Sequence, residues 1–92
     1  PMLRIATWNI NSVRLRIDQV ARFVTESRTD VLCLQEIKCL EDQFPRAAFE
    51  AMGLPHLKIG GQKGWHGVAI ASRSPRPRRS MSAVRAMPAA WG

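Results

Sequence analysis

The sequence predicts an α/β fold built on parallel strands, and three features indicate it. Residues 31–34 form an unbroken apolar run that is followed at once by polar and charged residues, as in a strand leaving a buried core. Residues 3–8 are apolar at alternate positions and end in residues that favour strands, and a helical repeat of apolar residues separates the two stretches. A strand, a crossover helix and a second strand in one sheet are parallel, and the crossover is right-handed.

The first strand is predicted over residues 3–8, and residues 9–12 follow as a polar turn. Asn11 or Ser12 can cap the next helix, because a short side-chain oxygen accepts from free amides of its first turn. The apolar residues that recur at helical spacing are Val13, Ile17, Val20, Ala21 and Val24. They predict an amphipathic helix that ends near Glu26.

The second strand is predicted from Val31 to about Glu36, after a loop at 27–30, and is expected to be buried on both faces. Residues 40–43 are a connector with the exposed acids Glu41 and Asp42.

A short helix is then expected to open at Phe44-Pro45, because proline suits a first helical turn, and to end at Gly53. Strands are predicted over 56–59 and 67–72, and they suggest a hairpin across the glycine-rich turn 60–64.

The net charge of +7 is concentrated at the carboxyl end of the chain. Residues 73–92 carry +5 with no acid, whereas residues 1–72 carry only +2. Residues 74–80 contain prolines, serines and arginines and no apolar residue, and no periodicity is evident after them. We therefore expect a domain over 1–73 and a disordered basic tail over 74–92.

Several classes of protein are not indicated. No apolar run is long enough for a membrane span, and the amino terminus lacks the pattern of a signal peptide. Cys33 and Cys39 form no C-x-x-C pair, and the two histidines complete no zinc pattern. Cys33 is expected to be a buried thiol, so a cytoplasmic location is the default expectation.

Asn9 and Glu36 follow the two predicted parallel strands, so they are expected to meet at one edge of the sheet. Magnesium takes oxygen ligands, often one or two carboxylates completed by water and phosphate. Asn9 could orient such a carboxylate or donate to phosphate. Taken alone, a carboxylate at a strand end is more often simply solvated, and two residues do not complete a metal site.

The turn Gly60-Gly61-Gln62-Lys63-Gly64 is not a P-loop, because it lacks the spacing and precedes a strand. A plain hairpin turn is the commoner interpretation. The functional interpretation is that glycine lets the backbone approach a phosphate while Lys63 supplies charge, with Trp65 and His66 against nucleic acid.

Four ordered segments together resemble the exonuclease III-type apurinic/apyrimidinic endonucleases of the endonuclease/exonuclease/phosphatase superfamily. The segments, given in full, are Ile5-Ala6-Thr7-Trp8-Asn9-Ile10-Asn11-Ser12-Val13-Arg14, Leu32-Cys33-Leu34-Gln35-Glu36-Ile37-Lys38, Phe44-Pro45 and Gly61-Gln62-Lys63-Gly64-Trp65-His66-Gly67-Val68-Ala69-Ile70. The resemblance covers residues 2 to about 73. It implies the amino-terminal part of a two-sheet α/β sandwich.

The resemblance also implies roles by position. Glu36 matches the metal-binding glutamate and Asn9 the asparagine that supports it, so these two are the implied catalytic and metal-site residues, with Mg²⁺ or Mn²⁺ as cofactor. The positions implied to lie near DNA are Asn11, Arg14, Lys38, Gln62, Lys63 and Gly64. Many relatives carry Asp where this chain has Asn11, and Trp65-His66 is not the commonest pair at its position.

The family domain is roughly 250 residues long, as expected of one large domain. Its later motifs with Tyr, Asp and His are absent here, since the chain has no Tyr and its last Asp is Asp42. We therefore expect a truncated or frameshifted fragment of a magnesium-dependent DNA-repair phosphodiesterase, an abasic-site endonuclease and 3′-to-5′ exonuclease that is inactive alone. Its expected partner is double-stranded DNA with abasic sites or 3′ ends, with no membrane and no obligate protein partner. The alternatives are a non-catalytic nucleic-acid binder that uses the basic tail, or a fragment of another phosphodiesterase of the superfamily.

Overall fold

Up to β4 (Val68–Ser72), the strands and helices follow one another in the predicted order. The computed structural model describes residues 3–60, 66–75 and 81–87. Its elements are β1 (Leu3–Asn9), α1 (Ile17–Ser27), β2 (Val31–Gln35), the 3₁₀ turn η1 (Glu41–Gln43), α2 (Arg46–Ala51), β3 (His56–Gly60), β4 (Val68–Ser72) and β5 (Met81–Met87).

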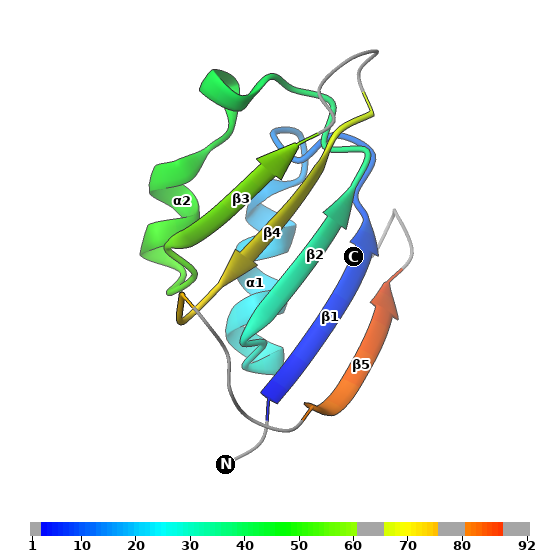
Figure 1. The fold of residues 1–92 in the computed structure, drawn as a ribbon, viewed down its shortest axis with the longest axis vertical. Helices are drawn as coiled ribbons and strands as arrows, with labels where there is room; N and C mark the ends of the chain where they lie inside the picture. Colours follow the sequence, from blue (N-terminus) through cyan, green and yellow to red (C-terminus); the bar gives the residue numbers. More distant parts are fainter. Residues whose placement is uncertain (1–2, 61–65, 76–80, 88–92) are drawn as a thin grey trace.

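The strands form one mixed sheet in the order β3-β4-β2-β1-β5 (Figure 1). β1 and β2 are parallel, with Ile5 opposite Val31 and Asn9 opposite Gln35. β3 and β4 are antiparallel to each other, and β4 is antiparallel to β2. The predicted strand–helix–strand unit and the predicted hairpin are both confirmed.

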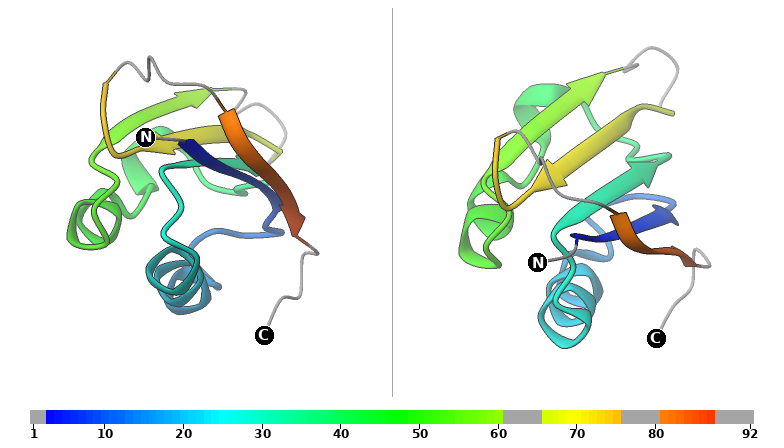
Figure 2. Two further views of the ribbon diagram at one scale, coloured as in Figure 1. Left: turned by 90° about the horizontal axis from the view of Figure 1, so that it is seen from below. Right: turned by 60° about the horizontal axis from the view of Figure 1, so that its bottom comes forward.

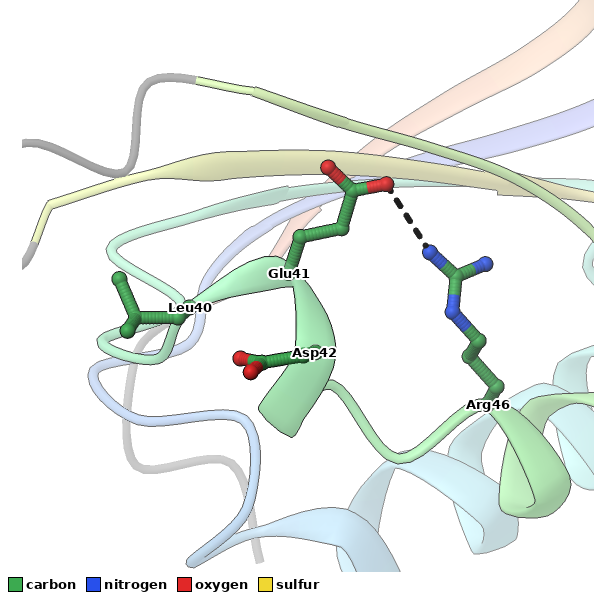
Figure 3. Close-up of a pocket in the computed structure, with 4 residues that line it drawn as sticks. All are labelled: Leu40, Glu41, Asp42 and Arg46. Carbon is green, nitrogen blue, oxygen red and sulfur yellow. Dashed lines mark hydrogen bonds and ion pairs between the residues drawn. The ribbon is translucent and has the colours of Figure 1, made fainter.

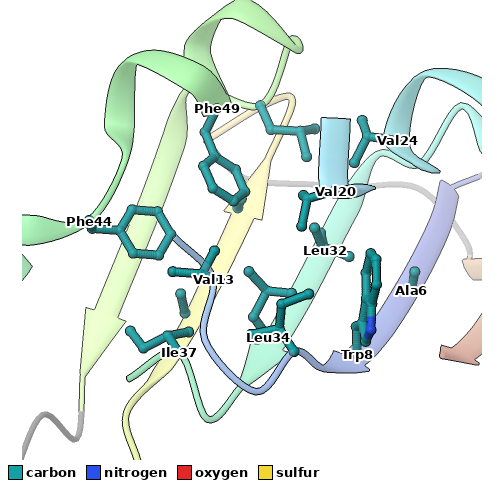
Figure 4. Packing of buried hydrophobic residues seen from close by; sticks show 14 of the residues in the cluster. Ala6, Trp8, Val13, Val20, Val24, Leu32, Leu34, Ile37, Phe44 and Phe49 are labelled. Atoms are coloured by element: carbon teal, nitrogen blue, oxygen red, sulfur yellow. The ribbon is translucent and has the colours of Figure 1, made fainter. Parts of the chain in front are cut away.

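Both helices lie on the same face of the sheet (Figure 2). The core between the two layers gathers alternate side chains of the strands with the apolar stripes of the helices (Figure 4). Trp8 is fully buried, and its ring meets Phe23 of α1 edge-on at 5.6 Å and 71°. Each large side chain buried in this way stabilises the fold by roughly 1.5–3 kcal/mol relative to exposure.

The opposite face of the sheet is not covered by either helix. Ile70 is 46% exposed and Val68 is 50% exposed on this face, and Cys33 of β2 is only half-buried. The predictions that β2 is buried on both faces and that Cys33 is a buried thiol are therefore wrong for this chain. The apolar run itself is real, but its alternate members pack against the helices on one side only.

The first helix begins later than predicted, at Ile17. Val13 is fully buried and its N–H donates to the carbonyl of Ile37 at 3.0 Å, so this segment belongs to the loop after β1. Ser12 Oγ accepts from the N–H of Leu15 at 3.4 Å, and α1 has no side-chain cap. Tertiary contacts to the neighbouring loop thus override the helical spacing of Val13.

The second helix agrees with its signals. Pro45 directly precedes α2, and Gly53 follows it with a φ of +92°. Phe44 and Phe49 pack together with ring centroids 5.0 Å apart, and both belong to the buried core cluster.

The carboxyl-terminal part differs from the expectation of disorder. Residues 81–87 form β5, which pairs in parallel with β1, with Ile5 opposite Val84 and a register shift between Leu3 and Arg4. The free edge of β1 offers backbone donors and acceptors, so pairing there does not require alternating side chains. Residues 76–80 and 88–92 of the predicted tail lie outside the described residues.

Candidate active site

The carboxyl ends of β1 and β2 bring Asn9 and Glu36 together. Asn9 is the last residue of β1, and Glu36 directly follows β2. The Nδ2 amide of Asn9 donates a hydrogen bond of 2.8 Å to Oε2 of Glu36. Asn9 is exposed and Glu36 is partly exposed, so the pair is open to a ligand.

The parallel pairing continues beyond the two strands into their loops. The N–H groups of Ile10 and Ser12 donate to the carbonyls of Gln35 and Glu36 at 3.0 and 2.9 Å. Because these bonds extend the ladder, the two loops are held as firmly as strand ends.

A second side-chain pair lies one step further along the same loops. Lys38 Nζ donates to Oδ1 of Asn11, and both residues are partly buried. Arg16 supports the same loop, since its Nε donates to the carbonyl of Ile10 at 2.8 Å. Arg16 is not among the site residues predicted from the sequence, and its role in the loop has no local signal.

Left-handed backbone is concentrated in these loops. Among non-glycine residues that the structure describes, Asn11, Ser12, Glu36 and Lys38 have φ values of +48°, +86°, +54° and +55°, and Arg28 at the end of α1 is the fifth. Each such residue costs of order 1–3 kcal/mol and persists only where its surroundings fix it. Strain of this kind clusters at functional sites, which favours this edge as the site.

A third segment completes the edge. The N–H groups of Ile37 and Lys38 donate to the carbonyls of Gly67 and His66, at 3.3 and 3.5 Å, just before β4 begins. The loop after β2 is therefore held between the loop after β1 and the start of β4. The contribution of Gly67 was not predicted from the sequence.

The other residues implied by resemblance have different placements. Arg14 is exposed in the turn before α1, and its charge lowers the pKa of the Cys39 thiol. Burial is the stronger influence and raises the pKa of Cys39 overall, with a smaller upward contribution from Asp42. Gln62, Lys63, Gly64 and Trp65 lie outside the described residues.

A separate open hollow lies beside η1, lined by Leu40, Glu41, Asp42 and Arg46 (Figure 3). Glu41 pairs with Arg46 at 3.2 Å, and both side chains are largely exposed. Its acids do not join Glu36, in agreement with their prediction as surface connector residues.

The donor atoms at the edge fit part of a magnesium site. Glu36 offers a carboxylate, the ligand type that Mg²⁺ prefers, and Mg²⁺ often takes only one or two from protein. Asn9 turns its amide nitrogen toward Glu36, which suits a residue that orients the carboxylate. Within residues 3–60, 66–75 and 81–87 no group of three potential His, Cys, Asp or Glu ligands gathers. The edge therefore fits one protein ligand with its orienting partner.

A pair of polar residues at the carboxyl end of parallel strands, held by strained loops, is typical of an enzyme of the α/β class. The chain belongs to the Endonuclease/Exonuclease/phosphatase family, whose pattern matches residues 6–88. This family consists of hydrolases, and the predicted family and fold are thereby confirmed.

Individual relatives agree with this assignment. Exodeoxyribonuclease III of Haemophilus influenzae is 35% identical over 71 residues, which cover 77% of this chain and 26% of the relative. The structure is similar to an AP endonuclease from Archaeoglobus fulgidus, with a TM-score of 0.71, 46% identity and coverage of 78% of this chain and 28% of that one. The same four values describe its similarity to the 3′ phosphatase NExo from Neisseria bound to a product DNA hairpin.

The chain spans about a quarter of the length of these relatives, and it matches the amino-terminal part of the AP endonuclease fold. The described helices include none long and apolar enough to cross a membrane.

Proposed function

We propose that this chain is the amino-terminal part of a divalent-metal-dependent DNA-repair phosphodiesterase that acts at abasic sites and at 3′ ends. The observation that carries the proposal is the hydrogen bond from Asn9 to Glu36 at the edge where parallel strands end. Relatives named as an exodeoxyribonuclease, an AP endonuclease and a 3′ phosphatase on a DNA hairpin support it.

Glu36 would hold the metal, with Mg²⁺ as the natural ion and Mn²⁺ as a substitute. When bound, such an ion supplies Lewis-acid stabilisation of the charge that develops on phosphate oxygens. Asn9 keeps the carboxylate turned toward the open edge. Lys38, held by Asn11, places a positive charge beside the same edge, where it can attract a phosphate backbone.

Arg14 and the segment Gln62–Gly64 extend this proposed DNA surface by their resemblance to the family. The five arginines of residues 73–92 add sequence-independent attraction for phosphates. A cytoplasmic location fits the two free thiols, Cys33 and Cys39.

The chain alone is expected to be inactive, because Glu36 and Asn9 provide no general base and few groups to stabilise the transition state. The direct test is incision of a duplex with one abasic-site analogue, with Mg²⁺ and then with chelator. Mg²⁺-dependent incision by the pure chain, absent from Glu36→Ala, would contradict inactivity.

The role of Glu36 is tested in a chimera in which residues 1–73 replace the matching segment of the Haemophilus exodeoxyribonuclease III. The chimera is expected to incise abasic DNA, and Glu36→Gln within it to reduce incision to background. Glu41→Gln is the matched control, since Glu41 is an exposed acid paired with Arg46. A Glu36→Gln chimera that cuts as fast as the unaltered chimera would overturn the proposed role.

A further inference from the structure

Gly67 lies against Ile37 where the loop after β2 meets the start of β4. A Cβ atom on Gly67 would lie 2.9 Å from Cγ1 of Ile37 and 3.3 Å from its Cδ1. The contact of 2.9 Å is closer than real Cβ atoms come, and Gly67 also has a φ of +56°. Only glycine therefore admits Ile37 at this distance without a shift of one of the two segments.

Both the side chain and the backbone of Ile37 are held by their contacts. Its side chain is fully buried in the core. Its N–H donates to the carbonyl of Gly67 at 3.3 Å, and its own carbonyl accepts from Val13 at 3.0 Å. Ile37 is thus an anchor between the loop after β1 and the start of β4.

Glu36 and Lys38 flank this anchor, and both have left-handed backbone, with φ values of +54° and +55°. Neither residue type favours this conformation, so the fixed position of Ile37 between them must hold it. The two strained residues are the ones whose side chains reach Asn9 and Asn11.

We propose that Gly67 is a positioning residue of the site. By leaving space for Ile37, it holds the turn 36–38 so that the Glu36 carboxylate stays on Asn9 and the Lys38 ammonium stays on Asn11. The importance of this role for activity rests on the proposed function, but the contact itself can be tested without metal or DNA.

The test is NMR of the full 92-residue chain, with the side-chain amide signals of Asn9 and Asn11 as reporters. Gly67→Ala is expected to shift both signals and to speed hydrogen exchange of the Asn9 amide several-fold. The side-chain amide of Gln35 donates to Thr7 Oγ1 at 2.9 Å on the sheet face opposite the helices. Its NMR signal should not shift.

Gly60→Ala is the matched control in the same hairpin. A Cβ at Gly60 would meet no atom within 4 Å, and Gly60 has no positive φ. If Gly67→Ala only disturbed the hairpin in general, it would shift the side-chain amide signal of Gln35 together with the signals of Asn9 and Asn11. A folded Gly67→Ala chain with unchanged Asn9 and Asn11 signals would overturn the proposal.

The steric cause is tested by a double-mutant cycle with Ile37→Ala, which removes both clashing atoms. The shift caused by Gly67→Ala should be smaller in the Ile37→Ala background than in the wild type. Equal shifts in both backgrounds would show that Ile37 does not transmit the effect, and would overturn the proposal.

If Gly67→Ala fails to fold, the variant Ile37→Val tests the proposal instead. It deletes one methyl group from the anchor and is expected to speed exchange of the Asn9 amide. Ile17→Val, the same deletion in a partly buried residue of α1, is its control. Equal exchange rates in these two variants would overturn the proposal.

Failure of the proposed function has a different signature. Mn²⁺ that does not broaden signals near Glu36 in the wild type would overturn the metal site. That result would not affect the role of Gly67, which is still tested by the positions of the Asn9 and Asn11 signals in Gly67→Ala.

Discussion

Asn9 and Glu36 are 27 positions apart in the sequence, and the amide of Asn9 donates to the carboxylate of Glu36 at 2.8 Å. Lys38 and Asn11 are separated by the same 27 positions and also pair. Both pairs arise because β1 and β2 are parallel and their ladder continues into the loops. The architecture of the sheet therefore builds the edge on which the proposed function depends.

Replacing Asn9 with Ala removes the donor that orients Glu36. Loss of such an orienting partner typically weakens metal binding roughly 10–100-fold, and we expect Asn9→Ala to weaken Mn²⁺ binding by this amount. The measurement is a titration followed by isothermal calorimetry. Gln35→Ala, which removes an amide at the end of β2 on the open face, is expected to leave the affinity unchanged. Equal losses in both variants would contradict the role of Asn9.

The sheet face opposite the two helices should bind apolar probes. Because Ile70 is 46% exposed, Ile70→Thr is expected to lower the fluorescence of a bound anilinonaphthalene dye. It is also expected to reduce the concentration-dependent association of the chain with itself. Its free energy of unfolding should change by no more than about 0.5 kcal/mol. Ala71→Thr, on the same strand but fully buried, should cost about 1–3 kcal/mol. Similar losses of stability in the two variants would contradict the one-sided packing.

Asp30 joins the start of β1 to the end of β4. It accepts from the backbone N–H of Arg4 at 2.9 Å and from Nε of Arg73 at 3.1 Å. Because the Arg73 side chain is 49% exposed, Arg73→Gln should cost less than about 1 kcal/mol, and added salt should reduce this cost. Asp30→Ala should cost about 1 kcal/mol more, since it also leaves Arg4 without its acceptor. Urea unfolding of both variants checks the order, and an equal cost would contradict it.

The free energy of unfolding should fall in alkaline solution, because the thiols of Cys33 and Cys39 ionise there. Burial raises the pKa of Cys39 and of Cys33 above the ordinary value of 9.0. The folded chain then holds these protons more tightly than the unfolded chain. The resulting stabilisation is complete below pH 9.0 and is lost as the pH rises through the folded pKa.

Urea unfolding between about pH 8 and pH 10 measures this loss. The variant with Cys33→Ala and Cys39→Ala is expected to show a smaller decline than the wild type. An identical decline in the two proteins would show that titratable groups other than these thiols cause the loss of stability.

Much of this fold could be predicted because its signals are local. The alternation in β1, the apolar run in β2 and the glycine after α2 each act within a few residues. The meeting of Asn9 and Glu36 was predictable too, since a helical crossover joins parallel strands and neighbouring parallel strands end at the same edge of the sheet.

The features that escaped prediction depend on partners distant in the sequence. Val13 is kept out of α1 by its bond to Ile37, and β5 forms on the free edge of β1 through backbone pairing. The fit of Gly67 to Ile37 is likewise a contact between two loops. Local patterns carry no record of such contacts.

The most direct measurement is a Mn²⁺ titration of the wild-type chain and of Glu36→Gln, followed by paramagnetic broadening of the backbone amide signals. Gln keeps the shape of Glu36 and an acceptor for Asn9 but loses the charge. We expect the signals of Asn9 and Glu36 to broaden first in the wild type, and this broadening to disappear in Glu36→Gln. Broadening that begins at Glu41 and Asp42, or that is unchanged in Glu36→Gln, would contradict a metal site at Glu36.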